Sequence, residues 1–148
     1  MPWPNRYGII KCMPEARIGG RSEYLSLTPP APATPTQAVA ILALGGLHAC
    51  TTVEEHWGGG FEDLVKFFES MEKSWRGWRE TKSWESLEGE LRLVAIHRGG
   101  HIQLKVTMRR SALDGGNDGW LAEGDLEIEP GEELTRVARD VAAFAGVL

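Results

Sequence analysis

Residues 91–108 alternate between apolar and polar side chains on both sides of a Gly99-Gly100 pair. A two-residue glycine loop of this kind closes a β-hairpin and sets the register of its two strands. The register predicts that His97 lies opposite Ile102. It pairs the other inward positions as Ala95 with Leu104, Leu93 with Val106 and Leu91 with Met108. Because these pairs are apolar, the pattern predicts an antiparallel sheet with one buried face.

Apolar residues at helical spacing predict two helices. The first covers residues 61–75 and begins with acidic residues, which suit the positive end of a helix. Its apolar stripe comprises Phe61, Leu64, Val65, Phe68, Met71 and Trp75. The second helix is predicted after Pro130-Gly131, because proline followed by acidic residues is typical of a helix start. Its stripe comprises Leu134, Val137, Ala138, Val141, Ala142, Ala145 and Leu148.

Further strands complete the predicted sheet. Residues 38–44 form a short apolar run, and the alternating residues 47–57 predict its hairpin partner. Residues 82–87 predict a strand whose turn pairs Trp84 with Leu93. A last strand directs one row of residues inward, namely Trp120, Ala122, Gly124, Leu126 and Ile128. We therefore expect an α+β fold with one antiparallel meander sheet of about five to six strands and two helices on one face, in the order β-β-α-β-β-β-β-α.

The beginning of the chain follows neither pattern. Residues 1–22 show no clear periodicity, although Tyr24 to Leu27 is compatible with a short edge strand. Residues 28–36 are rich in proline, which is typical of an extended linker. We therefore expect residues 1–36 to be loosely packed or irregular and residues 37–148 to form a single domain.

Composition narrows the classes of partner. The formal net charge of −5 argues against nucleic acid, because phosphate backbones are bound by basic surfaces, and it is compatible with a basic protein. The two cysteines, Cys12 and Cys50, form no disulfide or metal-binding pattern. Free thiols indicate a reducing compartment, so we expect a cytoplasmic protein. The longest apolar run, residues 38–44, is too short to span a membrane.

No residue pattern indicates catalysis or metal binding. The predicted register places His97 and His101 on opposite faces of the hairpin, so that they cannot share a metal ion. We expect His97 to lie at the edge of the core and to hydrogen-bond to a neighbour. The sequence contains no phosphate-binding loop and no nucleophile motif, and we expect neither an enzyme nor a cofactor.

Two groups of residues are candidates for binding. Trp75, Trp78 and Trp84 cluster around the predicted helix-to-strand turn with Arg76, and with Trp120 they are candidates for lining a pocket. An acidic row on the outer face of the last strand comprises Glu123, Asp125, Glu127 and Glu129, of which the first three are the candidates for binding. Each group also has a structural interpretation, as core packing for the tryptophans and as a solvated face for the carboxylates.

Three short motifs carry a resemblance to a known family. They are Trp-Arg-Gly-Trp at residues 75–78, Trp-Glu-Ser-Leu-Glu-Gly at residues 84–89 and Glu-Pro-Gly-Glu-Glu-Leu at residues 129–134. Together they resemble an actinobacterial family of unknown function over about residues 38–148. The layout also resembles, more loosely, the WapI-type immunity proteins of polymorphic toxin systems, which are small acidic α+β proteins.

This resemblance and the acidic balance predict a non-enzymatic protein that binds a basic, toxin-like protein through the acidic row and the Trp-Arg turn. The alternative is a small-molecule-binding domain with a tryptophan-lined pocket between sheet and helices. A deep cavity bounded by Trp75, Trp84 and Trp120 would favour the alternative, and a filled core would count against it.

Overall fold

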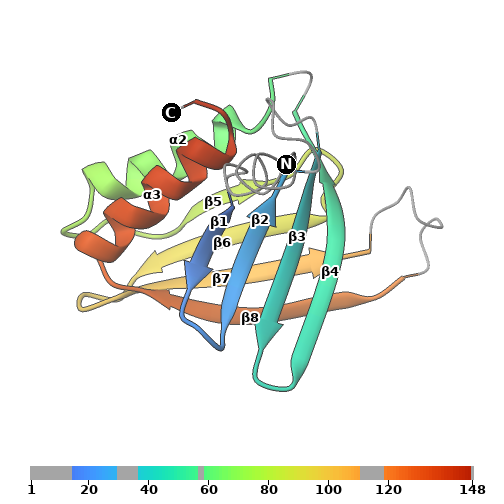
Figure 1. The fold of residues 1–148 in the computed structure, drawn as a ribbon. Helices are drawn as coiled ribbons and strands as arrows, with labels where there is room; N and C mark the ends of the chain where they lie inside the picture. Colours follow the sequence, from blue (N-terminus) through green and yellow to red (C-terminus); the bar gives the residue numbers. More distant parts are fainter. Residues whose placement is uncertain (1–14, 30–36, 57–58, 111–118, 148) are drawn as a thin grey trace, which may run out of the picture.

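The structure, a computed structural model, describes residues 15–29, 37–56, 59–110 and 119–147. Within these ranges the chain forms two four-stranded antiparallel sheets and two helices. Figure 1 shows that the strands of one sheet cross those of the other steeply, as in sandwiches whose sheets pack orthogonally. Both helices lie together at one side of the sheets (Figure 1).

The strand order is β1-β2-β3-β4 in the first sheet and β5-β6-β7-β8 in the second. The first sheet contains β1 (Ala16–Gly19), β2 (Tyr24–Thr28), β3 (Gln37–Leu44) and β4 (Leu47–Glu54). The second sheet contains β5 (Lys82–Glu85), β6 (Leu91–His97), β7 (Ile102–Arg109) and β8 (Leu121–Ile128). The helices are α2 (Glu62–Lys73), which connects the two sheets in sequence, and α3 (Glu132–Phe144), which follows β8.

The register predicted around Gly99-Gly100 is confirmed. Strands β6 and β7 pair His97 with Ile102, Ala95 with Leu104, Leu93 with Val106 and Leu91 with Met108. The backbone amide of Arg98 donates a hydrogen bond to the carbonyl oxygen of His101 at 2.8 Å and closes the loop. The predicted pairing of Trp84 with Leu93, between β5 and β6, is confirmed as well.

The expectation of a single sheet of about five to six strands is wrong. The predicted order of elements fits from β3 onward, but the β3–β4 hairpin joins β1 and β2 in a separate sheet. The inner faces of the two sheets are in contact where Gly124 of β8 meets Leu44 at the end of β3. The contact is so close that a methyl group placed at Gly124 would overlap with Cδ1 of Leu44. An alternating pattern shows which face of a strand is buried, but it does not show whether helices or a second sheet bury that face.

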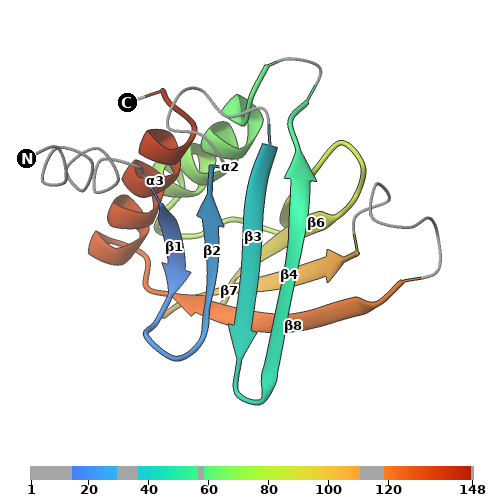
Figure 2. The same cartoon turned by 45° about the vertical axis from the view of Figure 1, so that its right-hand side comes forward.

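The two helices pack against each other and lie next to the edge strands β1 and β5. The rings of Phe61, just before α2, and Phe144, at the end of α3, lie 5.3 Å apart between their centres. Figure 2 shows α3 beside β1, with α2 behind it. The predicted placement of both helices on one face of one sheet is therefore wrong, since they cover a side that both sheets share. The sequence pattern also missed Phe144 as a core residue.

Two strands lie in the range that was expected to be irregular. Their inward side chains are fully buried, namely Ala16, Ile18, Leu25 and Leu27. Strand β2 lies between β1 and β3 and is not the edge strand expected at its position. The expectation therefore has to be corrected for residues 16–28, because strands of four and five residues give too weak a periodic signal. Residues 1–14 and 30–36 lie outside the described residues.

Candidate functional site

The turn that follows α2 contains two of the tryptophans that the sequence singles out. Nε2 of His97 donates a hydrogen bond to the carbonyl oxygen of Trp75 at 2.8 Å, and Nδ1 accepts one from the amide of Gly99 at 3.1 Å. The indole of Trp78 meets the His97 ring edge-on at 5.1 Å, and its Nε1 donates to the carbonyl oxygen of Ala95 at 3.4 Å. His97 is therefore the hydrogen-bonded histidine at the core edge that the sequence predicts. It holds the Trp75–Trp78 turn on the second sheet.

The side chain of Trp75 is 48% exposed, so its predicted place in the buried stripe of the first helix is wrong. Helix α2 ends at Lys73, and the turn after it directs the indole away from the core. Cζ of Arg76 lies 5.1 Å from the centre of the Trp75 ring, within the range of a cation–π contact. The same ring borders a pocket of about 180 Å³ between α2 and α3, to which Leu134 also contributes.

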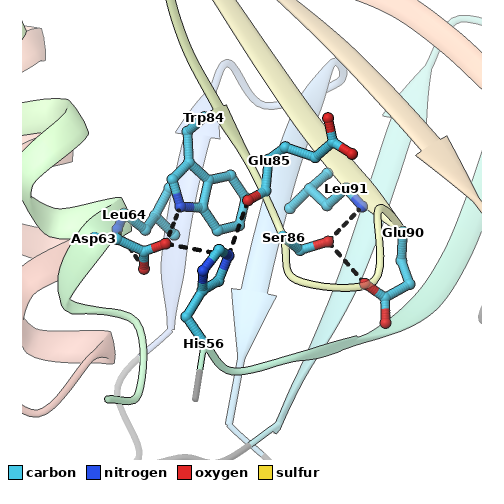
Figure 3. Close-up of polar contacts among 8 residues, drawn as sticks. All are labelled: His56, Asp63, Leu64, Trp84, Glu85, Ser86, Glu90 and Leu91. Carbon is cyan, nitrogen blue, oxygen red and sulfur yellow. Dashed lines mark hydrogen bonds and ion pairs between the residues drawn. The ribbon is translucent and has the colours of Figure 1, made fainter. Parts of the chain in front are cut away.

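Trp84 lies on the core side of β5, as predicted, and is only 7% exposed. Its Nε1 donates a hydrogen bond to Oδ2 of Asp63 in the first turn of α2 at 2.8 Å (Figure 3). Nε2 of His56 lies 3.3 Å from the same Oδ2 and 3.0 Å from the carbonyl oxygen of Glu85 (Figure 3). This cluster therefore joins the residues after β4, the start of α2 and strand β5.

A carboxylate that orients a histidine is a familiar arrangement in enzymes that use a general base. In this cluster, Nε2 of His56 is already engaged by Asp63 and by the carbonyl oxygen of Glu85. Among the described residues, no hydroxyl or thiol group hydrogen-bonds to His56. The geometry therefore indicates a structural junction. The sequence did not predict this junction. Asp63, as an acidic residue in the first turn of a helix, already had an interpretation as a helix-start residue, and no sequence spacing links His56 to Trp84.

The turn between β5 and β6 contains a buried polar pair. Oγ of Ser86 donates to Oε1 of Glu90 at 2.7 Å and accepts a hydrogen bond from the amide of Leu91 at 3.1 Å (Figure 3). Glu90 is 1% exposed, and its Oε2 has no hydrogen-bond partner among the described residues. A buried carboxylate depends on the donors it has, so Ser86 stabilises this turn. The motif at residues 84–89 thus has a role in the fold.

The structure does not bring the predicted tryptophans together around one pocket. Trp84 is buried against Asp63, whereas Trp75 is exposed at the end of α2. Trp120 is 39% exposed and precedes β8, which begins at Leu121, so its predicted inward position is wrong. A continuous cluster of buried apolar residues fills the space between the sheets.

Three members of the acidic row, Glu123, Asp125 and Glu127, lie on the outer face of β8, as predicted, and Glu129 follows the end of the strand. Oε2 of Glu123 accepts a hydrogen bond from Oγ1 of Thr107 at 2.8 Å, and its Oε1 lies 3.9 Å from Nζ of Lys105. Glu123 is therefore partly neutralised by the neighbouring strand. No side-chain hydrogen bond or ion pair engages Asp125 among the described residues.

Asp125 and Glu127 also line a groove of about 450 Å³. Its other wall is the turn between β1 and β2, from which Glu23 joins the two carboxylates of β8. Oε2 of Glu23 accepts a hydrogen bond from the amide of Gly45 at 3.0 Å, which orients this carboxylate. Nδ1 of His101, which also lines the groove, lies 4.0 Å from Oε1 of Glu127. The sequence did not predict Glu23, because no local pattern links residue 23 to residue 125.

Three other properties of the described residues bear on function. No cluster of three or more potential metal ligands occurs in the part of the chain that the structure describes. Cys50 is an exposed free thiol, and Cys12 lies outside the described residues. Within the same ranges, no helix combines the length and the apolar character that crossing a membrane requires.

Comparison with known proteins gives a family match and no individual relative. A family model described as a family of unknown function (DUF6228) matches residues 21–147. The match begins before β2, whereas the motif resemblance starts at about residue 38. No curated protein and no solved structure matches the chain.

Proposed function

The chain belongs to the family of unknown function DUF6228, and from this starting point we propose that it is a non-enzymatic, immunity-like protein that binds a basic protein partner. The observation that carries the proposal is the groove whose lining includes the three acidic residues Glu23, Asp125 and Glu127. We refer to it as the acidic groove. Its partner would place lysine or arginine side chains in this groove, beside these carboxylates.

The charge of the acidic groove supports a basic occupant. None of its described lining residues is a lysine or an arginine, and its one histidine, His101, lies 4.0 Å from Glu127. Hydrogen bonds between a guanidinium or ammonium group and carboxylates are stronger than those between neutral groups. The net charge of −5 adds a long-range attraction that accelerates association with a basic protein.

The position of the acidic groove supports binding by a surface that needs little rearrangement. Asp125 and Glu127 lie on a strand that pairs along its whole length with β7. Glu23 lies in the turn between two paired strands and is oriented by the amide of Gly45. Because the backbone that carries these residues is held before a partner arrives, little backbone entropy is lost on binding.

The remaining chemistry of the described residues favours binding over catalysis. The His56–Asp63 pair is engaged by Trp84 and by the backbone of Glu85, which suits a structural role. The exposed thiol of Cys50 fits a reducing compartment, and we include the cytoplasm in the proposal.

Affinity capture with charge-reversal variants tests this proposal. The wild-type protein, the Asp125→Lys/Glu127→Lys variant and a control are exposed in parallel to a lysate of the source organism, and bound proteins are quantified by mass spectrometry. The control is Glu80→Lys/Glu88→Lys, which makes the same charge change at two exposed residues flanking β5. Strand β5 is at the opposite edge of the second sheet from β8.

We expect the wild type and the control to retain one basic protein in stoichiometric amount. The groove variant is expected to retain at least about tenfold less of it, because two like charges replace two attractive ones. Equal retention by all three proteins, or no basic protein bound to the wild type, would contradict the proposal.

A further inference from the structure

The indole of Trp75 is half exposed, and the hydrogen bond that joins this residue to the second sheet uses its backbone. Its carbonyl oxygen accepts the hydrogen bond from His97, and any residue at this position supplies a carbonyl. The ring remains 48% exposed, and Arg76 lies over it. Tryptophan and arginine are enriched among the residues that dominate protein interfaces. The exposure of Trp75 therefore points to a contact with another molecule.

Trp75 also borders the pocket between α2 and α3, and we refer to this pocket as the Trp75 pocket. Leu134 of α3 provides a second apolar side chain, and Glu72 of α2 provides a carboxylate. The pocket volume is about 180 Å³. A cavity of roughly 150 Å³ holds a benzene-sized group, so the Trp75 pocket has the size of one large apolar side chain.

An open groove along α3 lies between the Trp75 pocket and the end of β8. It shares Gly131 and Thr135 with the pocket, and its charged lining residues are Glu129, Glu132, Glu133, Arg136, Arg139 and Asp140, of which Arg136 is ion-paired with Asp140. Glu129 follows Glu127 of the acidic groove by two residues, or about 7 Å at strand spacing. Figure 1 shows the end of β8 leading directly to the start of α3. A single partner segment can therefore reach both sites.

We propose that the Trp75 pocket is the anchor site for an aromatic or large aliphatic side chain of the basic protein partner. This inference rests on the proposed function, because the same partner places lysine or arginine residues along the acidic groove and the carboxylates of Glu129 and Glu132. The side chains of Glu129 and Glu132 have no hydrogen-bond or ion-pair partner among the described residues, so both are available to such cations. The apolar side chain lies against Trp75 and Leu134, and Glu72 favours a basic residue next to it.

A random peptide library displayed on phage tests the anchor with a defined probe. Selection on the wild-type protein is expected to enrich peptides that combine lysine or arginine with an aromatic or large aliphatic residue. The most enriched peptide is then synthesised and titrated against wild type, Trp75→Ala and Trp120→Ala by calorimetry. Trp120 is the matched control, since it is also an exposed tryptophan, at 39%. It precedes the first residue of β8, whereas the Trp75 pocket lies beyond the last residue of that strand.

We expect Trp75→Ala to weaken binding at least about tenfold and Trp120→Ala to change it less than about twofold. Thr135→Arg provides a second variant, because it fills the Trp75 pocket from the exposed side of α3 and leaves Trp75 in place. It is expected to weaken binding to a similar extent. Circular dichroism of each variant shows that the fold is retained.

The outcomes separate the anchor from the acidic groove. If Trp75→Ala and Thr135→Arg bind the peptide as tightly as the wild type, while Asp125→Lys/Glu127→Lys does not, the anchor is wrong and the proposed function stands. If the selection enriches no basic peptides, both proposals are wrong. If the enriched peptides are basic but contain no apolar residue in common, the anchor alone is wrong.

Discussion

Gly124 of β8 is a point where the two sheets touch, and the substitution Gly124→Ala tests the two-layer architecture. The new methyl group would overlap with Cδ1 of Leu44, which reaches across from the end of β3. The backbone at Gly124 does not have a positive φ, so the steric contact is the only obstacle to a side chain. We expect Gly124→Ala to destabilise the wild type and to stabilise a Leu44→Ala variant.

The magnitude follows from two opposing effects. Leu44 has to leave its rotamer, which costs about 0.5–1.5 kcal/mol, and overpacking a contact between layers costs about 1–3 kcal/mol. Leu44 is only partly buried and can move, which favours the lower end of these ranges. Replacing glycine by alanine within a strand returns about 0.5–1 kcal/mol. The free energy of unfolding is therefore expected to fall by about 0.5–1 kcal/mol in the wild type and to rise by about 0.5–1 kcal/mol when Leu44 is alanine.

Urea unfolding of the wild type, both single variants and the double variant measures this coupling as a double-mutant cycle. Gly100→Ala is the control, because a methyl group at Gly100 meets no atom within 4 Å. Its effect is expected to be the same with leucine or alanine at position 44. If Gly124→Ala also has the same effect in both backgrounds, within about 0.5 kcal/mol, Leu44 does not pack on Gly124 and the reasoning is wrong.

Two further substitutions test the polar junctions of the second sheet by urea unfolding. Trp84→Phe removes the donor to Asp63 and is expected to lower the free energy of unfolding by about 1–2 kcal/mol. The control Trp120→Phe is expected to change it by less than about 0.5 kcal/mol. Equal effects of the two substitutions would contradict the role of the indole hydrogen bond. Ser86→Ala removes the hydroxyl donor to the buried carboxylate of Glu90 and is expected to cost about 1–3 kcal/mol. That cost should shrink when Glu90 is replaced by leucine, and an undiminished cost would show that the pair is not coupled.

Local patterns in the sequence predicted those parts of the fold that short-range geometry determines. The Gly99-Gly100 loop set the register of β6 and β7. The turn between β5 and β6 placed Trp84 opposite Leu93. The outward direction of the acidic row on β8 followed from the same alternation. In each case a turn of known length and a period of two residues leave one arrangement.

Contacts between distant segments could not be predicted in this way. Leu44 meets Gly124, and Glu23 joins Asp125, only because one sheet lies across the other. Alternation in each strand is the same whether its apolar face packs on helices or on a second sheet. The acidic groove depends on that packing, so the sequence showed two of its carboxylates and missed the third.

The three tryptophans around the α2–β5 turn differ in what the fold requires of them. The Nε1 atom of Trp84 donates to Asp63, and the indole of Trp78 packs on His97 and donates to a backbone carbonyl. Trp75 contributes a carbonyl oxygen to the same network, and its ring faces solvent beside Arg76. These contacts account for the indoles of Trp78 and Trp84, whereas the Trp75 ring stays half exposed. A solvated aromatic ring beside a small apolar pocket gains free energy when a partner covers it, and this is the role that we propose for Trp75.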